Sequence, residues 1–449
     1  MSQRIFGTDG IRGHAGEGWL EPAATAQVAL AVARRVLETR GPAEGPPRAL
    51  LGHDGRASGP ELIAAFARGL GSAGFELAHA GLIPTPGLAW LARERDFDLG
   101  VMVSASHNPA TDNGIKLFGR GGGKFGADDE RAVEQGLHGG RLVVPERPAP
   151  EVDPSLASAY AHALVEAAGV ELSGVRVVVD CANGAGSAVA PDVLVRLGAE
   201  VHAIHAAPDG LNINADCGST HPESLQAEVL RRDAALGFAL DGDGDRCLLV
   251  DERGELVDGD AMLTLFAHHA VARGAWSDRR VVATVMSNKG LERALREVGV
   301  GLVRVPVGDR HVVEALRAEG LPLGGEQSGH VVFGADHAYI GDGIYTALRA
   351  LRVVRESGRT LSELAGAFRA FPQVLVNVRV ARKPDLAGLP RVAAKLAEIE
   401  AELGEDGRVL LRYSGTEPLA RVMIEGPEQE RIQRLADDLA GRIAAEIGA

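Results

Sequence analysis

The stretch RRVVATVMSNKGLERALREVGVGLVRVPVGDRHVVEALRAEG, residues 279–320, contains two strand–helix units in succession. In each unit, a run rich in valine is followed by a segment whose apolar residues recur with helical spacing. The same alternation occurs in residues 48–74 and begins again at residue 175. Strands without polar alternation are typical of a parallel sheet that helices cover on both faces. The sequence therefore predicts an α/β fold.

Composition and charge exclude several classes of function. The chain has 449 residues and a formal net charge of −14, whereas a nucleic-acid partner requires a basic surface. A small anion remains a candidate ligand if a pocket concentrates arginine and lysine locally. The 3 cysteines form no CxxC pair, and no apolar run approaches the ~20 residues that span a bilayer. We therefore expect a cytoplasmic protein with neither a nucleic-acid nor a membrane partner.

Two changes of pattern divide the chain. The segment VVPERPAPEVDPS, residues 143–155, contains four prolines and is a candidate domain boundary. From residue 373, the pattern changes to strand, helix, two strands and a long terminal helix, which predicts a small α+β domain.

Three aspartates directly follow an apolar strand in FALDGDGDRCLLVD, residues 238–251. Asp241, Asp243 and Asp245 alternate with glycines, and carboxylates this close repel one another unless a cation neutralises them. Oxygen ligands of this kind favour Mg²⁺ or Ca²⁺. Arg246 stands where an EF-hand loop needs glycine, which argues against that motif. An acidic turn in solvent explains three aspartates between buried strands poorly, so we predict a divalent-metal loop.

The segment VSASHNP, residues 103–109, ends another apolar strand in two serines, a histidine and a proline. Such residues commonly cap a helix or close a turn. Alternatively, one serine is exposed at the carboxyl end of the strand, where α/β sheets place their functional sites. His107 beside the serine does not make a catalytic triad, and no G-x-S-x-G elbow is present, so ester hydrolysis is weakly supported.

Two polar turns lie further along the chain. In RYSGTEP, residues 412–418, hydroxyl and backbone N–H groups beside arginines predict a phosphate site, although a plain hairpin turn is the commoner case. In GGEQSGH, residues 324–330, Glu326, Ser328 and His330 alternate, so an extended loop would point all three the same way, toward sugar hydroxyls. A flexible surface loop is the alternative.

These motifs resemble those of the α-D-phosphohexomutase superfamily, in the family's order, between residue 4 and about residue 426. The motifs are FGTDGIRG (6–13), SASHNP (104–109), DGDGDR (241–246), GGEQSGH (324–330) and RYSGTEP (412–418). The glutamine at position 327 resembles the branch of the family that acts on amino-sugar phosphates. The glucose and mannose branches usually carry another residue at this position.

The resemblance implies four domains around a central cleft, one more than the roughly three suggested by chain length. Three similar α/β domains with mixed sheets would precede a smaller α+β domain. The expected domains are 1–150, which carries a phosphoserine; 151–255, which binds metal; 256–370, which binds sugar; and 371–449, which binds phosphate. The family is also compatible with a homodimer.

The resemblance further implies an isomerase that interconverts glucosamine 6-phosphate and glucosamine 1-phosphate for UDP-N-acetylglucosamine synthesis. Ser106, which directly precedes the histidine, would carry a phosphoryl group and exchange it with the sugar through a 1,6-bisphosphate. One Mg²⁺ would be held by Asp241, Asp243, Asp245 and the phosphate on Ser106.

The remaining roles are also implied by the resemblance. Arg12 and Lys116 would place charge near the phosphoserine, although a lone arginine or lysine is usually solvated. Lys116 and His330 are both candidates for the general acid/base. Glu326 and Ser328 would hold the sugar hydroxyls. The non-transferring phosphate would be held by Arg412, Ser414, Gly415, Thr416 and Arg421.

Three other functions fit parts of this pattern. A phosphoglucomutase or phosphomannomutase of the same superfamily would use the same residues on another sugar. A metal-dependent sugar phosphatase would lose the serine phosphate to water. A catalytically silent sugar-phosphate-binding protein would have no need of the intact serine and three intact aspartates.

Overall fold

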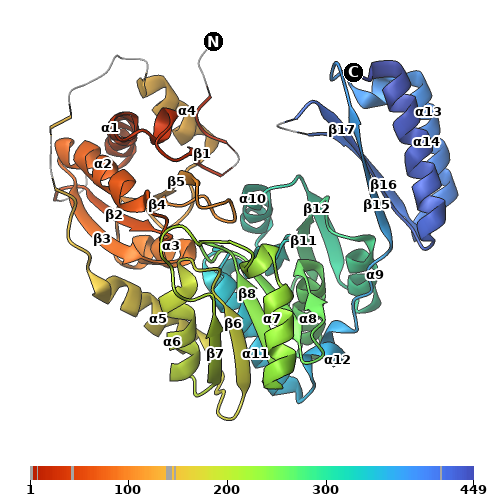
Figure 1. The fold of residues 1–449 in the computed structure, drawn as a ribbon. Coiled ribbons are helices and arrows are strands. Elements are labelled where there is room, and N and C mark those ends of the chain that lie inside the picture. The colour runs from red at the N-terminus through yellow and green to blue at the C-terminus, as the bar shows by residue number, and fades with distance from the viewer. Residues whose placement is uncertain (1–3, 8, 42–44, 138–143, 146–147, 415–416) are drawn as a thin grey trace.

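The computed structural model describes residues 4–7, 9–41, 45–137, 144–145, 148–414 and 417–449. Its elements form four units that follow one another in an arc, with the first and last units at its two ends (Figure 1). Among the described residues, no helix is both long and apolar enough to cross a bilayer.

Unit I is a five-stranded mixed sheet between two layers of helices. Its strands are β1 (Ile11–His14), β2 (Arg48–His53), β3 (Glu76–Leu82), β4 (Leu99–Val103) and β5 (Asp112–Gly119), in the order β1-β5-β4-β2-β3. Strands β3, β2 and β4 are parallel, whereas β5 runs antiparallel to β4 and β1. Its helices are α1 (Pro22–Thr39), α2 (Gly59–Ser72), α3 (Thr85–Glu94) and α4 (Ala127–Gly136).

Alternate residues of β4 pack into different cores, as a doubly covered sheet requires. Leu99, Val101 and Val103 pack with α1, α2 and α4, whereas Met102 packs on the opposite face with α3. This explains why the sequence of β4 carries no polar alternation.

Units II and III repeat this plan. Unit II has β6 (Arg176–Asp180), β7 (Glu200–Ile204), β8 (Leu236–Leu240), β9 (Cys247–Asp251) and β10 (Leu256–Val257), in the order β10-β9-β8-β6-β7, with α5 (Pro154–Ala168), α6 (Gly186–Arg196) and α7 (Glu223–Arg232). Unit III has β11 (Arg280–Thr284), β12 (Gly301–Val305), β13 (Leu323–Gly325) and β14 (Val331–Val332), in the order β12-β11-β13-β14, with α8 (Gly259–Ala272), α9 (Lys289–Glu297), α10 (Asp309–Glu319), α11 (Gly343–Ser357) and α12 (Leu361–Ala365).

Unit IV has a different architecture. Its antiparallel sheet, in the order β15-β17-β16, is covered on one face by two helices. The elements are β15 (Gln373–Arg379), α13 (Pro390–Leu403), β16 (Arg408–Tyr413), β17 (Leu419–Glu425) and α14 (Gln429–Ile447). The expected fold class, three α/β domains with mixed sheets and a smaller α+β domain, is therefore confirmed.

The units differ in how they are joined. One continuous apolar core runs from α5 and β6 through α8 to β11 and α11, so units II and III pack as one body. Unit IV has its own core and meets unit III through polar contacts. Arg408 of β16 donates to the carbonyl oxygens of Val285 (3.0 Å) and Ser287 (2.9 Å), and Lys289 N donates to Glu425 Oε2 (3.1 Å).

A buried carboxyl lies beneath this junction. Asp260 Oδ2 accepts from the backbone N–H of Asn288 (2.7 Å), and the Asn288 side chain donates to Phe371 O (3.1 Å) at the entrance to unit IV. Burial, reinforced by the charge of Asp258, raises the pKa of Asp260 to about 7. The folded chain therefore holds a proton here that the unfolded chain releases near its ordinary pKa.

We predict that Asp260 makes the protein less stable as the pH rises from about 4 to 7, because in this range the unfolded state binds fewer protons. Asp260→Asn should remove up to about 4 kcal/mol of that pH dependence of the unfolding free energy. Urea unfolding at several pH values measures it. The exposed Asp437→Asn should behave as the wild type, and an unchanged pH slope in Asp260→Asn would contradict the assignment.

Candidate active site

Ser106 lies three residues beyond the end of β4, which is a central strand of unit I. The expectation of an exposed serine is wrong: Ser106 is only 1% exposed. Unit II covers it, because Asn214 Nδ2 donates to the Ser106 carbonyl oxygen (2.9 Å) and Gly242 packs against the same oxygen. A Cβ on Gly242 would lie 2.6 Å from that oxygen, so only glycine fits there.

The Ser106 hydroxyl faces the aspartate loop. Its Oγ donates to Asp241 Oδ2 (2.6 Å) and lies 3.3 Å from His107 Nδ1. Burial, followed by the charges of Arg246 and Arg12, lowers the pKa of His107 to about 4. The imidazole beside Ser106 is therefore neutral near pH 7.

The three predicted aspartates come together in the turn between β8 and β9. One oxygen from each of Asp241, Asp243 and Asp245 lies within 4.8 Å of the others. Burial and the charges of Asp245 and Asp243 raise the pKa of Asp241 to about 8. Within the described chain, the buried Oδ1 atoms of Asp243 and Asp245 have no hydrogen-bond partner. Unpaired carboxylate oxygens in this arrangement fit a hard divalent cation.

Lys116, in β5, supplies positive charge to the same loop. Its Nζ lies 2.7 Å from Asp243 Oδ2, 3.0 Å from Asp9 Oδ2 and 3.3 Å from Asp245 Oδ2, and the side chain is 2% exposed. Burial alone would lower its pKa, but the charges of Asp243, Asp9 and Asp245 outweigh burial and hold it well above the ordinary value. Lys116 is thus a buried ammonium and not the solvated lysine that its type alone suggests.

His330 approaches the aspartate loop from unit III. Its Nδ1 lies 3.8 Å from Asp245 Oδ1 and its Nε2 lies 3.9 Å from Asp309 Oδ2. Burial lowers its pKa, but the interaction with the nearby Asp245 carboxylate outweighs burial, so the pKa is raised. Both acid/base candidates, Lys116 and His330, therefore contact the aspartate loop.

The sequence analysis missed three charged residues of this site. Asp9 accepts from Arg12 (2.7 Å), and Lys124 pairs with both Asp9 and Asp309, which joins unit I to unit III. The signal for Asp9 was its place in FGTDGIRG. Lys124 lies in the glycine-rich segment GRGGGKFG, which fails as a nucleotide-binding loop, so nothing in its spacing identified it.

The predicted sugar-binding segment is a tight turn between β13 and β14, not an extended loop. Glu326 N donates to His330 O, and Gly329 N donates to Glu326 O, both at 3.0 Å. As a result Ser328 is exposed whereas His330 is buried, and the alternation in sequence does not place them on one side. Gly259 of α8 supports the turn, since a Cβ there would lie 1.9 Å from Glu326 O.

The predicted phosphate site lies in unit IV. Arg412 of β16 and Arg421 of β17 are paired across the sheet, and Arg421 Nη2 lies 3.4 Å from Ser414 Oγ. Burial and then the charge of Arg421 lower the pKa of Arg412. Two adjacent guanidinium groups favour an anion between them. The other two predicted members, Gly415 and Thr416, lie outside the described residues.

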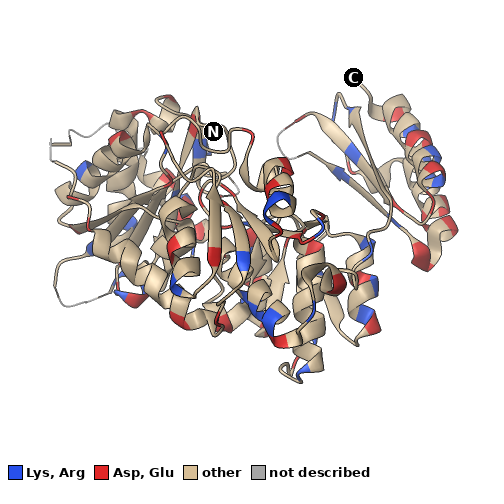
Figure 2. Ribbon diagram, turned by 60° about the horizontal axis from the view of Figure 1, so that its bottom comes forward, with Lys and Arg blue, Asp and Glu red and all other residues tan. Residues whose placement is uncertain are grey.

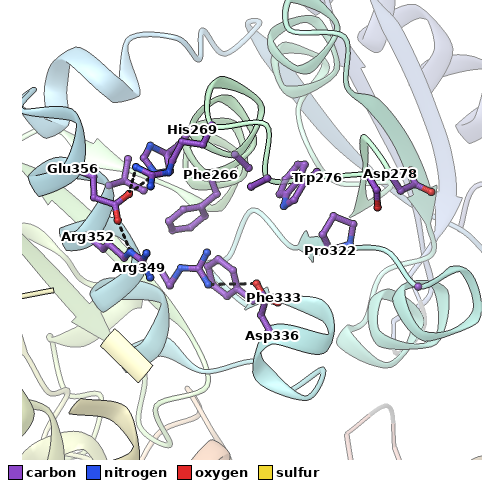
Figure 3. Close-up of a pocket in the computed structure, with 16 residues that line it drawn as sticks. Phe266, His269, Trp276, Asp278, Pro322, Phe333, Asp336, Arg349, Arg352 and Glu356 are labelled. Carbon is purple, nitrogen blue, oxygen red and sulfur yellow. Dashed lines mark hydrogen bonds and ion pairs between the residues drawn. The ribbon is translucent and has the colours of Figure 1, made fainter. Parts of the chain in front are cut away.

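A cavity of about 400 Å³ in unit III is not part of this site. Its wall carries Phe266, Trp276 and Phe333, with Arg352 paired to Glu356 (Figure 3). It includes none of the predicted site residues. By contrast, Asp245 and His330 line a smaller cavity of about 150 Å³ between units I and III.

Four family models match the chain in order. They are Phosphoglucomutase/phosphomannomutase alpha/beta/alpha domain I (residues 3–142), domain II (158–254), domain III (258–371) and the C-terminal domain (375–442). Their order and extent define the class expected from the motifs, a four-domain α-D-phosphohexomutase. The chain belongs to the phosphoglucomutase/phosphomannomutase family.

Two phosphoglucosamine mutases and one crystal structure are similar to this chain over nearly its whole length. The phosphoglucosamine mutase of Thermobifida fusca is 48% identical over 448 residues, which cover 99% of both chains. That of Rhodococcus opacus is 49% identical over 453 residues, covering 98% of this chain and 99% of the relative. The crystal structure of a phosphoglucomutase/phosphomannomutase family protein from Burkholderia thailandensis superposes with a TM-score of 0.82 at 27% identity, over 100% of both chains.

We predict that the protein binds one divalent cation at the aspartate loop. Asp243→Asn should weaken binding by at least about tenfold, because it removes one charged oxygen from the set. Calorimetric titration with Mn²⁺ measures the affinity. Glu255→Gln, which changes an exposed carboxylate just after β9, is the control and should bind as the wild type. Equal affinities of all three proteins would rule out this site.

Proposed function

We propose that this chain is a phosphoglucosamine mutase that interconverts glucosamine 6-phosphate and glucosamine 1-phosphate through a phosphoserine at Ser106 and a 1,6-bisphosphate. The observation that carries the proposal is the buried Ser106 hydroxyl held 2.6 Å from a carboxylate oxygen of the aspartate loop. The names of the full-length relatives from Thermobifida fusca and Rhodococcus opacus support the choice of sugar.

Phosphoryl transfer leaves little covalent chemistry to the protein, which must position the groups and neutralise charge. In the forward step the bond from phosphorus to Ser106 Oγ breaks, a bond to a sugar hydroxyl oxygen forms, and the hydroxyl proton passes to a base. Lys116 enters the cycle protonated, so it is the candidate acid that gives a proton to the departing Ser106 Oγ, and His330 is the candidate base that takes the proton of the sugar hydroxyl.

The aspartate loop would hold Mg²⁺ through Asp241, Asp243 and Asp245, together with a phosphate oxygen on Ser106. When bound, Mg²⁺ supplies charge neutralisation to the transferring phosphoryl group. Arg12 and Lys116 add positive charge on the unit I side.

The sugar would be held from units III and IV. Glu326 and Ser328 are the proposed ligands of its hydroxyls, while Arg412, Ser414 and Arg421 would hold the phosphate that is not transferred, with Gly415 and Thr416. Because this is a single phosphate site, the bisphosphate must turn around before its second phosphate can reach Ser106. The independent core of unit IV and its polar junction with unit III would allow unit IV to open for that step.

The proposed mutase would act in the cytoplasm on a small-molecule amino-sugar phosphate. It would need neither a nucleic acid nor a membrane, and it is compatible with a homodimer. Acidic and basic residues alternate along the outer helices of unit IV (Figure 2). The formal net charge of −14 is opposite in sign to the basic balance that nucleic-acid binding requires.

Ser106→Ala should abolish both mutase activity and the covalently bound phosphate, because it removes the oxygen that carries the phosphoryl group. Coupled assay of glucosamine 1-phosphate and intact-mass measurement before and after incubation with the bisphosphate give the two readouts. Ser72→Ala, at the exposed end of α2, is the control.

Retained activity in Ser106→Ala would refute the nucleophile. Release of inorganic phosphate without any 1-phosphate would favour a phosphatase instead. Equal turnover of glucosamine, glucose and mannose 6-phosphates by the wild type would leave the family function but refute the narrower sugar assignment.

Arg412→Ala should raise KM for glucosamine 6-phosphate by about 10- to 100-fold with a small change in kcat, since it removes a charged hydrogen bond that ground and transition states share. Steady-state kinetics separate the two constants. Arg434→Ala, on the exposed face of α14, should leave both constants unchanged. A fall in kcat at unchanged KM would place Arg412 in the transfer step instead.

A further inference from the structure

Arg56 is a fully buried arginine in the loop between β2 and α2, where the motif analysis placed no function. Its guanidinium group donates to four backbone carbonyl oxygens of the loop that carries Ser106. These acceptors belong to Ser106 (2.9 Å), Asn108 (2.9 Å), Asp112 (2.9 Å) and Pro109. One side chain therefore binds four backbone carbonyl oxygens between residues 106 and 112.

Asp54, the carboxylate that pairs with Arg56, is connected through Ser104 to the backbone N–H of Ser106. Asp54 Oδ2 accepts from Arg56 Nε (2.9 Å) and from Ser104 Oγ (2.7 Å), and Ser104 Oγ in turn accepts from the Ser106 backbone N–H (2.8 Å). The N–H and the carbonyl of Ser106 are thus both fixed by a single buried ion pair, one through Ser104 and the other directly.

The backbone of Ser106 needs such support. Its φ angle is +53°, in the left-handed region that a residue with a side chain adopts only when its surroundings enforce it. A relaxed backbone at Ser106 would turn the hydroxyl away from Asp241.

Asn214 of unit II contacts two of the same carbonyl oxygens. Asn214 Nδ2 donates to the carbonyl oxygens of Ser106 (2.9 Å) and Asn108 (3.0 Å), the two that Arg56 Nη2 also contacts. The carbonyl oxygens of Ser106 and Asn108 therefore accept hydrogen bonds from both Arg56 and Asn214. The Ser106 hydroxyl donates its own hydrogen bond to Asp241.

We propose that Arg56 is a positioning residue for phosphoryl transfer: together with Asp54 and Ser104 it locks Ser106 in its left-handed conformation, with Oγ directed at the aspartate loop. The inference rests on the proposed function. It assigns a separate role to each serine of the SASHNP motif. Ser106 would carry the phosphoryl group, and Ser104 connects the Asp54 carboxylate to the Ser106 backbone N–H by two hydrogen bonds.

Arg56→Lys separates positioning from mere charge. Lysine keeps the positive charge but cannot donate to Asp54 and four carbonyl oxygens at once. We expect kcat to fall by about 100-fold, the usual effect of a small misplacement of a reacting group, with KM for glucosamine 6-phosphate within about twofold of wild type. Ser104→Ala, a smaller change, should lower kcat about tenfold with KM unchanged, because it removes one relay hydrogen bond.

Arg40→Lys is the matched control in unit I. Arg40 is also paired with a buried carboxylate, Asp98 (2.9 Å), and also donates to two backbone carbonyl oxygens, those of Gly45 and Pro46. It makes no contact with the Ser106 loop. Arg40→Lys should therefore retain wild-type kcat even where it loses stability.

Amide hydrogen exchange provides a readout that needs no activity. In Arg56→Lys, exchange should accelerate in residues 104–112 and stay unchanged in strands β2, β3 and β4 of unit I; Arg40→Lys should leave residues 104–112 as in the wild type. Unchanged kcat and exchange in both Arg56→Lys and Ser104→Ala would overturn the inference, as would a loss of kcat in proportion to unfolding throughout unit I. If the wild type lacks mutase activity, the proposed function fails, whereas exchange in residues 104–112 still decides whether Arg56 holds the loop.

Discussion

The burial of three carboxylates in one turn is the constraint on which the rest of the structure depends. Asp241, Asp243 and Asp245 are each at most 5% exposed, and like charges at this distance and depth are strongly unfavourable without compensation. Part of the compensation comes from Arg246 of their own unit, whose backbone N–H donates to Asp241 Oδ1 (3.2 Å), and part comes from outside that unit. Lys116 of β5 in unit I pairs with Asp243, and the Thr85 hydroxyl of the same unit donates to Asp243 Oδ2 (2.5 Å), while the Thr85 backbone N–H donates to the Asp243 carbonyl oxygen (2.9 Å).

This requirement explains why three units form one frame. The aspartate turn of unit II is contacted by Lys116 and Thr85 of unit I. Unit III contacts the same turn, since Gly343 N donates to Gly244 O (3.0 Å). Lys124 then ties unit I to unit III through Asp9 and Asp309. No described residue of unit IV takes part in this charge balance, and the unit meets unit III through hydrogen bonds of Arg408 and Glu425.

The sequence predicted what local pattern and motif identity determine. Apolar runs predicted the positions of β2, β6, β11 and β16, and the alternation of aspartate with glycine predicted the acidic loop that could hold a metal ion. It could not predict contacts between distant segments: the burial of Ser106 arises from Asn214 more than 100 residues away, and Arg56 has no local signature at all. The turn at residues 326–330 was misjudged because alternation fixes side-chain direction only in extended backbone.

Charge balance would also link the proposed phosphoserine at Ser106 to the proposed cation. Lys116 is shared among Asp243, Asp245 and Asp9, so it neutralises only part of the acidic group, and two carboxylate oxygens remain unpaired. A phosphoryl group on Ser106 would add about 1.5 to 2 further negative charges beside Asp241. The unphosphorylated Ser106 instead donates a hydrogen bond to Asp241 Oδ2. On the proposed mechanism, a phosphorylated Ser106 would have no hydroxyl proton to donate there, so a cation in the aspartate loop would offset the added charge, and the metal and the covalent phosphate would depend on each other.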